Sequence, residues 1–131
     1  MLSKIDALRA YGAMLNSLNA KDFAPLLADD FRYESFWVFA EIKSKQEYLQ
    51  YITNKLRAMR ASDKKVWAEL GHCFWGPCVV IAEDEEENLV ATVVVEVEGD
   101  KIMRMDLCGV PSPDLATRTG EYPGCSDIKE R

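Results

Sequence analysis

The sequence predicts a single α+β domain in which N-terminal helices pack against a mostly antiparallel sheet. In the first third of the chain, apolar residues recur at three- and four-residue steps, which is typical of helices. From Phe31 the period changes to two, and after Lys64 strand-like runs are separated by turn signals. With 131 residues the chain can bury roughly two-thirds of its unfolded surface, which is enough for a real core.

The first helix is predicted from one apolar stripe. Ser3, followed three residues later by Asp6, resembles a capping box at the start of this helix. Asp22 can cap a second, short helix with Pro25 in its first turn, where a missing N–H group breaks no helical hydrogen bond. The stripe of the first helix contains Ile5, Leu8, Tyr11, Leu15 and Leu18.

A strand and a third helix are expected next. Residues 31–39 carry apolar groups on both faces of the predicted strand, so both faces should be covered. Ser44 and Glu47 form a second capping box, and the helix that follows ends near residues 61–63. Its apolar stripe consists of Tyr48, Leu49, Ile52, Leu56 and Met59.

Four more strands complete the predicted sheet. Short polar or Gly-containing turns separate them, so they should form an antiparallel meander, and the strand beginning at Phe31 can add at one edge. The four runs cover residues 66–73, 78–82, 89–98 and 101–108.

The end of the chain has a different composition. The segment from Gly109 to Arg131 holds three of the five prolines and three of the seven glycines, so it cannot form a long regular element. We therefore expect a domain over residues 1–109 and a Pro/Gly-rich tail over residues 110–131. Partial wrapping of the tail, through Leu115, Tyr122 and Ile128, is favoured over loose order.

Net charge and hydropathy disfavour some classes of binding partner. A formal net charge of -6 disfavours nucleic acid, whose phosphates require clustered Lys and Arg. The only basic cluster, at Arg57, Arg60, Lys64 and Lys65, is interpreted as a solvated helix end. The N-terminal residues contain no long apolar run, so neither a signal peptide nor a membrane span is expected, and the cytoplasm is the default location.

The four cysteines indicate neither a disulfide framework nor a metal site. The spacing of Cys73, Cys78, Cys108 and Cys125 matches no common metal knuckle, and reduced thiols are expected. His72 with Cys73 and Cys78 could ligate zinc in principle, but a second spaced pair of ligands is missing. We therefore expect no metal and no cofactor.

Three segments together resemble the nuclear-transport-factor-2-like (NTF2-like) superfamily. They read LNAKDFAPLLADDFRYES at 18–35, KSKQEYLQYI at 43–52 and EVEGDKIMRMDLC at 96–108. The resemblance covers residues 3–109. The superfamily includes ketosteroid isomerases and SnoaL-like polyketide cyclases. The resemblance implies a cone of three N-terminal helices on a strongly bent, mostly antiparallel sheet, an apolar cavity, and a homodimer. Side chains that point into such a cavity decide the activity.

The residues that a ketosteroid isomerase would need do not carry over. Its base position falls on Ser35, which cannot take up a proton near neutral pH without a base of its own. Its tyrosine position falls near Met14, and its protonated acid near Thr92 or Val93. An isomerase of that mechanism is therefore disfavoured.

Other polar residues remain candidates for acid–base work. On the last predicted strand, Arg104 and Asp106 share one face and Met103 and Met105 share the other, and the sequence does not decide which face lines the cavity. Arg104 and Asp106 could polarise a substrate or form a surface ion pair, and the ion pair is favoured. His72, the only imidazole, could act as a base with Asp106, although an ordinary strand position is favoured.

A ligand pocket lined by aromatic residues is the second candidate site. Aromatic walls bury much ligand area while their polar tips orient the ligand, although plain core packing also explains such residues. Tyr33 and Trp37 share a strand face with Ser35. The candidate ligand-binding residues are Tyr33, Ser35, Trp37, Tyr51, Trp67, Met103 and Met105.

Three functions therefore remain open. The first is a small-molecule-binding protein whose ligand is hydrophobic or aromatic. The second is a lyase, isomerase or hydrolase that uses His72 with Asp106 and Arg104. The third is a protein-interaction module that uses the sheet face.

Overall fold

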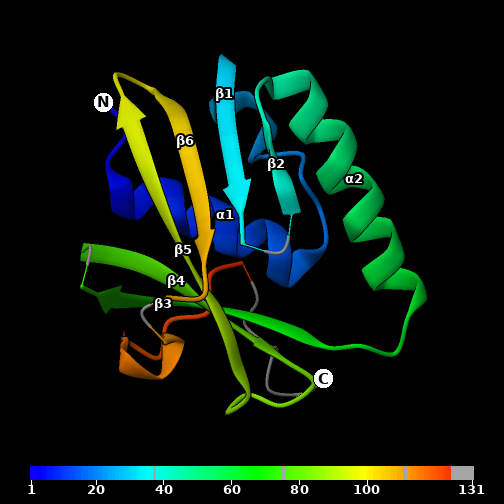
Figure 1. Ribbon diagram of the computed structural model, residues 1–131, viewed down its shortest axis with the longest axis vertical. Coiled ribbons are helices and arrows are strands. Elements are labelled where there is room, and N and C mark those ends of the chain that lie inside the picture. The colour runs from blue at the N-terminus through cyan, green and yellow to red at the C-terminus, as the bar shows by residue number, and fades with distance from the viewer. Residues whose placement is uncertain (37, 75, 111, 125–131) are drawn as a thin grey trace.

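The computed structural model describes residues 1–36, 38–74, 76–110 and 112–124, without the side chains of residues 38–40 (Figure 1). It contains two α-helices, two short 3-10 turns and seven strands over that part of the chain. In chain order they are α1 (Lys4–Ser17), η1 (Ala24–Leu26), β1 (Leu27–Ser35), β2 (Val38–Ile42), α2 (Lys45–Ala61), β3 (Val66–Cys73), β4 (Gly76–Glu83), β5 (Leu89–Glu98), β6 (Lys101–Cys108), η2 (Pro113–Leu115) and β7 (Thr117–Arg118).

All seven strands form one sheet in the order β2-β1-β6-β5-β4-β3-β7. The run from β3 to β6 is the predicted antiparallel meander. β1 adds to its edge by parallel pairing with β6, and β2 extends the sheet beyond β1. In Figure 1 the strands β1 and β6 run across the direction of β3 and β4, with α1 behind them, so the sheet curves around the helix. The predicted α+β class is confirmed.

The predicted strand over residues 31–39 is in fact a hairpin of two strands. β1 ends at Ser35, which pairs with Val38 of β2, and Tyr33 pairs with Ile42. The two-residue period hid this turn because no Gly, Pro, Asn or Asp marks it, and because aromatic and aliphatic residues continue through it. Phe36 lies in the turn.

The N-cap hydrogen bond of each predicted capping box is present, whereas the predicted second helix is only a 3-10 turn. The Ser3 hydroxyl accepts a hydrogen bond from the Asp6 amide at 3.0 Å, and Ser44 accepts one from the Glu47 amide at 3.1 Å. The Glu47 carboxylate in turn accepts from the Lys43 amide at 3.2 Å. The turn η1 is short because β1 begins at the next residue, and no room remains for a full α-helical turn.

The core lies between the helices and the concave face of the sheet. α1 contributes buried residues at three- and four-residue steps, as predicted, although Ile5 at its start is 40% exposed. On the sheet, Val79 of β4, Val93 of β5 and Leu107 of β6 pair in register and point into this core. Alternation then directs the neighbouring residues to the outer face.

The structure shows which face of β6 points into the core. Met105 and Leu107 are buried in the core, so Arg104 and Asp106 point to the outer face of the sheet. The pairing also slips by one residue, because Val97 is opposite Ile102 whereas Glu96 is opposite Arg104. This bulge interrupts the strict alternation that the sequence predicts for β6.

The described part of the tail packs on the domain. The turn η2 contacts β5, and β7 pairs with β3 at Gly71. Of the expected contact residues, Tyr122 packs near Trp67, Leu115 is 75% exposed, and Ile128 lies outside the described residues. The tail then reaches α1, so it passes around the β3 edge of the sheet.

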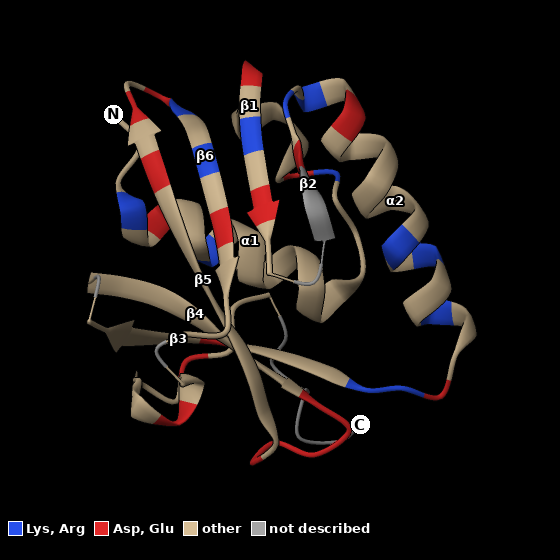
Figure 2. Ribbon diagram, viewed as in Figure 1, with Lys and Arg blue, Asp and Glu red and all other residues tan. Residues whose placement is uncertain are grey.

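Charge is unevenly distributed over the molecule (Figure 2). Acidic residues fill the β4–β5 turn, residues 83–87, whereas the second half of α2 carries Lys55, Arg57 and Arg60. Over the described residues, neither helix is long and apolar enough to cross a membrane.

Candidate functional site

Four tyrosines lie together in the core, and we call them the tyrosine cluster: Tyr11 of α1, Tyr33 of β1, and Tyr48 and Tyr51 of α2. The Tyr33 ring centroid is 5.1 Å from that of Tyr48 and 5.8 Å from that of Tyr51. These distances lie in the range of favourable aromatic contacts. The cluster fills the space between α2 and the concave face of the sheet.

Local structure explains why the cluster forms. Alternation along β1 turns Tyr33 and Ser35 inward, and both are buried. Tyr48 and Tyr51 are three residues apart on α2 and therefore lie on neighbouring positions of one helix face. The Tyr33 hydroxyl lies near the side chains of Ser35 and Tyr51, and both affect its pKa. The apolar interior thus contains a small group of hydroxyls from β1 and α2.

Three phenols of the cluster, those of Tyr11, Tyr33 and Tyr48, stay neutral. Burial raises the pKa of Tyr11, Tyr33 and Tyr48 above the usual value for tyrosine, and the neighbouring phenols raise it further. A neutral phenol can donate or accept a hydrogen bond, but it does not act as a base at physiological pH. The cluster is suited to orienting a ligand carbonyl or hydroxyl group.

A pocket of about 150 Å³ lies beside the cluster, between both helices and the start of the β3–β4 hairpin. We call it the small pocket. Tyr11, Val66 and Ile81 belong to its wall, and Lys64 and Glu83 form an ion pair at its edge with 2.8 Å between Nζ and Oε2. A cavity of this volume holds a single aromatic ring, as an engineered cavity of about 150 Å³ that binds benzene demonstrates.

Two lysines of the small pocket also contact neighbouring side chains. The Lys55 ammonium also lines the pocket and lies 5.9 Å from the centroid of the Tyr51 ring, in the range of a weak cation–π contact. The Glu83 carboxylate raises the pKa of Lys64, which therefore stays charged. The pocket has an apolar interior and a charged edge.

The structure brings together part of the predicted ligand-binding set. Tyr33, Ser35, Tyr51 and Met105 belong to the core side of the sheet and α2, and Met105 is paired with Tyr33 across β1 and β6. Trp37 lies outside the described residues.

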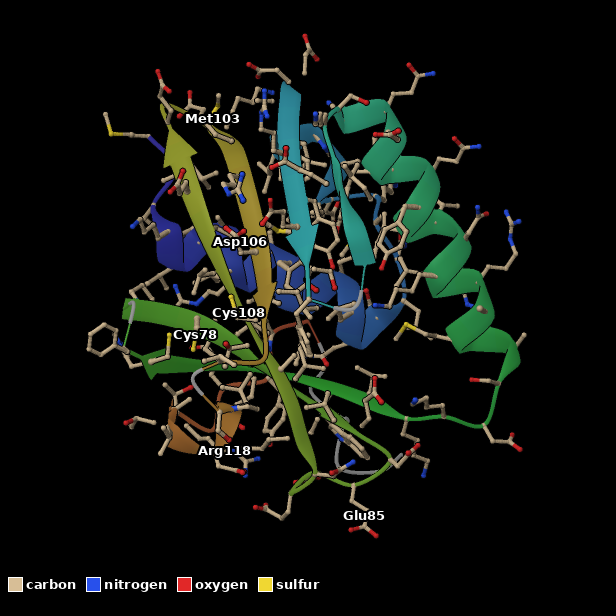
Figure 3. The ribbon with its side chains drawn as sticks, in the orientation of Figure 1. Cys78, Glu85, Met103, Asp106, Cys108 and Arg118 are labelled. Atoms are coloured by element: carbon tan, nitrogen blue, oxygen red, sulfur yellow. The ribbon has the colours of Figure 1, made fainter. Side chains whose placement is uncertain are left out.

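Two other predicted ligand-binding residues lie elsewhere. Trp67 packs on the opposite side of the sheet with Ala82, Leu89 and Tyr122, and its buried indole N–H has no hydrogen-bond partner among the described residues. Met103 is half-buried at the β6 bulge (Figure 3). Neither residue lies with the tyrosine cluster, because strand parity and the bulge place them away from it.

Arg104 and Asp106, two of the predicted catalytic residues, belong to an ion-pair network on the outer face of the sheet (Figure 3). Two nitrogens of Arg104 donate to the Asp106 carboxylate at 3.0 and 2.9 Å, and a third donates to Glu41 at 2.9 Å. Asp106 raises the pKa of Arg104, and Arg104 lowers the pKa of Glu41. A guanidinium paired in this way holds strands together and is not free to bind substrate in the core.

His72, the third predicted catalytic residue, is exposed near the end of β3. It is paired with Pro77 on one side and Thr117 on the other. Two strands, β4 and β5, separate β3 from β6 in the sheet. His72 and Asp106 therefore do not form one site.

Three of the four cysteines lie in the described residues and are free. Burial raises the pKa of Cys78 to about 12, with further contributions from Cys73 and Cys108, and burial also raises the pKa of Cys108 (Figure 3). Such thiols stay protonated and react slowly. Within the described ranges, no group of three His, Cys, Asp or Glu side chains is placed to hold a metal ion.

Sequence reasoning missed the residues of the small pocket. Tyr11 has the spacing of an ordinary core residue, and Glu83 begins an acidic turn that any solvent-exposed loop could contain. The pocket exists because α1 and β4, which are distant from each other in the chain, meet the end of α2 and the start of β3, which is a tertiary arrangement. Only the positions of Tyr11 and Leu15 on the stripe of α1 and of Met59 on the stripe of α2 were visible in the sequence.

No protein-family model and no curated protein matches the sequence, but solved structures match the fold. An NTF2-like protein of unknown function from Cytophaga hutchinsonii is 12% identical, with a TM-score of 0.58, over 86% of this chain and 95% of that chain. A SnoaL-like protein of unknown function from Burkholderia thailandensis is 14% identical, with a TM-score of 0.59, over 86% and 91%. A candidate polyketide cyclase from Sinorhizobium meliloti is 13% identical, with a TM-score of 0.56, over 82% and 100%.

These similarities first define the class, an α+β protein whose curved open sheet surrounds its helices. More specifically, the chain has the nuclear-transport-factor-2-like fold. The resemblance predicted from the three sequence segments is therefore confirmed at the level of the fold.

Proposed function

We propose that this protein binds a small, uncharged, largely apolar molecule in the small pocket, next to the tyrosine cluster. The observation that carries this proposal is the combination of an apolar pocket of about 150 Å³ with neutral phenols in its wall and beside it. Apolar walls favour burial of a ring, and the Tyr11 hydroxyl supplies a polar group that can orient the ligand.

The similar structures support this proposal through their fold. One is SnoaL-like and one is a candidate polyketide cyclase, and the second description concerns a reaction on a small organic molecule. Because the identities are below 15%, the site of this chain has to be argued from its own residues. Those residues favour binding, since Arg104, Asp106 and His72 lie away from the tyrosine cluster.

One observation favours an enzyme as a second candidate. Glu83 is a carboxylate in the lining of the small pocket, and Tyr11 is a hydrogen-bond donor in the same lining. A carboxylate and a neutral phenol are the groups needed to move a proton next to a carbonyl. Proton–deuterium exchange of a bound ketone that Glu83→Gln abolishes would support this candidate. Equal exchange in both proteins would exclude it.

Binding is tested directly with two probes of the same size. Phenol and toluene are titrated into isotope-labelled protein, and backbone amide shifts report the site. We expect saturable shifts around Tyr11, Val66 and Ile81, with phenol bound more tightly than toluene because it can pair with the Tyr11 hydroxyl. No saturable shifts at these residues with either probe would contradict the proposal.

Two variants sharpen the test. Tyr11→Phe keeps the ring and removes the hydroxyl, so the preference for phenol over toluene should fall by roughly tenfold. Tyr122→Phe makes the same change at a tyrosine that packs near Trp67, and it should leave the preference unchanged. An equal effect of both substitutions would show that the hydroxyl of Tyr11 does not contact the ligand.

We further propose that the protein forms a homodimer in a reducing compartment such as the cytoplasm. Exposed Val110 and Leu115 and the half-exposed Phe36 ring supply apolar area for an interface, and free thiols suit a reducing environment. Sedimentation velocity should give a dimer for the native chain and a monomer for the double variant Val110→Asp, Leu115→Asp. A monomeric native chain would contradict the dimer.

A further inference from the structure

A second hollow, of about 570 Å³, lies on the other side of α2, against the loop that follows α1. We call it the basic groove. Its apolar part includes Leu18 and Ala20 from the loop and Leu56 from α2. Its charged residues are Lys21, Arg57 and Arg60. No described residue belongs to both the lining of the basic groove and that of the small pocket, so the two are separate sites.

The sequence places these residues together for simple reasons. On α2, Leu49, Leu56 and Arg60 recur at intervals of seven and four residues and therefore lie on one side of the helix. At the end of α1, Leu18 takes the left-handed conformation with φ of 57°, which turns the chain out of the helix. The following residues, including Lys21, then run beside α2.

One of the three cations has a structural role. The Arg60 guanidinium donates a hydrogen bond to the Leu18 carbonyl at the end of α1. It thereby pairs an orphan carbonyl at the helix C-terminus, where partial negative charge accumulates. This contact with α1 explains the presence of Arg60 without a ligand.

The other two cations have no such role. Among the residues that the structure describes, the side chains of Lys21 and Arg57 make no hydrogen bond or ion pair. The lining of the groove includes no acidic residue, although the whole chain has a net charge of -6. Two unpaired cations thus lie beside apolar side chains in a hollow whose volume is typical of ligand sites.

We infer that the basic groove binds a small organic anion, a phosphate or carboxylate head joined to an apolar body. Lys21 and Arg57 pair with the head through charge-assisted hydrogen bonds, which are stronger than neutral ones. The apolar body lies on the partly exposed Leu18, Ala20 and Leu49, where it removes apolar surface from water. The groove therefore takes a charged ligand, whereas the small pocket takes an uncharged one.

The inference is tested with octyl phosphate and octanoate, each below its micelle concentration. Inorganic phosphate and octanol serve as probes for the head and the body alone. We expect saturable amide shifts in residues 18–24 and 49–60, and an affinity for the better amphiphile roughly tenfold or more above that for either part alone. The better amphiphile identifies the head as phosphate or carboxylate.

Charge reversal provides the matched comparison. The double variant Lys21→Glu, Arg57→Glu should weaken binding of the better amphiphile by roughly a hundredfold, because it replaces two attractive charges with two repulsive ones. Lys4→Glu reverses an exposed charge on the first turn of α1, away from the groove, and should change affinity by less than about twofold.

Two results would overturn the inference. The first is full affinity in the double variant. The second is a native chain that shows no saturable shifts in residues 18–24 and 49–60, or whose shifts occur only around Tyr11 and Ile81. The shift map uses the native protein, so it does not depend on how the variants fold.

Discussion

Asn16 joins three parts of the chain through one buried amide. Its Nδ2 donates to the carbonyls of Ala68 at 2.9 Å and Pro123 at 2.8 Å, and its Oδ1 accepts from the Ala68 amide at 2.9 Å. The side chain thus satisfies both backbone groups of one β3 residue and a carbonyl of the tail. A buried backbone group without a partner is strongly unfavourable, so this amide decides whether α1, β3 and the tail fit together.

Asn16→Ala should therefore lower the free energy of unfolding by roughly 3 kcal/mol, because it leaves several buried backbone groups unpaired. Urea unfolding monitored by circular dichroism measures the change. Asn54→Ala, on the exposed side of α2, removes the same amide and should change stability by less than about 0.5 kcal/mol. Equal losses for both variants would contradict the role assigned to Asn16.

Single residues differ in how well the sequence predicts them. The capping residues Ser3 and Ser44 were predicted with their partners, because a cap and the residue that it bonds are neighbours in the chain. The partners of Asn16 could not be predicted in this way, since Ala68 and Pro123 are distant from it in the chain. A polar residue on an apolar helix stripe is the only hint, and it does not name the groups that it pairs with.

At the scale of elements, β7 protects the edge of the sheet at β3. Thr117 and Arg118 pair with β3, and the Thr119 amide donates to the Leu70 carbonyl at 3.1 Å. This approach requires a glycine, because a Cβ on Gly71 would lie 2.8 Å from the Thr117 carbonyl oxygen. An uncovered edge strand could pair with other chains, so β7 also guards against aggregation.

Gly71→Ala should push β7 away from β3 and lower stability by about 1–3 kcal/mol, as overpacking does in general. Hydrogen exchange provides the specific measurement. The amides of Leu70 and Thr119, which bond across this edge, should exchange faster, whereas the amides that join β5 to β6 should keep their protection. Uniformly faster exchange throughout the sheet would indicate general destabilisation and contradict a local role.

Most elements were predictable, and the exceptions share a cause. The meander has turns marked by Gly, Pro and acidic residues, so its strands could be located along the chain. The hairpin of β1 and β2 has no such mark at Phe36 and was read as one strand. Which residues of β6 face the core could be decided only from the structure, because an alternating strand has two faces and only packing selects the one that is buried.

At the scale of the whole molecule, the buried thiols and phenols make the free energy of unfolding fall at alkaline pH. Burial raises the pKa of Cys78 to about 12, and it raises the pKa of Tyr11, Tyr33 and Tyr48 above the usual value of tyrosine. In the unfolded chain these groups ionise near pH 8.5 and pH 10. Above those values the unfolded state binds fewer protons than the folded state, so stability falls as pH rises.

We therefore expect full stability below about pH 8 and a decline that begins near pH 8.5 with the thiols and steepens near pH 10 with the phenols. Each fully buried group contributes a slope of about 1.4 kcal/mol per pH unit. Urea unfolding at a series of pH values gives the slope. Cys78→Ala should reduce it between about pH 9 and pH 11, and an unchanged slope in this variant would contradict the assignment.

The candidate sites were the least predictable part of the molecule. Tyr33 and Ser35 were predicted to share one strand face, because alternation along a strand is visible in the sequence, whereas Tyr51 was a candidate only as an aromatic residue. The two hollows lie between segments distant in the chain, on either side of α2, and no local pattern marks them. The predicted meander itself places two strands between those of His72 and Asp106, and the structure has this order.

The path of the tail also constrains how the protein is made. On the ribosome, the Asn16 amide of α1 obtains its Pro123 partner only after 107 further residues have been synthesised. β1 likewise waits for its parallel neighbour β6, whose pairing residues are about seventy positions later. Such distant pairings delay folding until the partner residues have been synthesised. A nascent chain of this protein therefore exposes the apolar stripe of α1 until β6 and residue 123 have been synthesised.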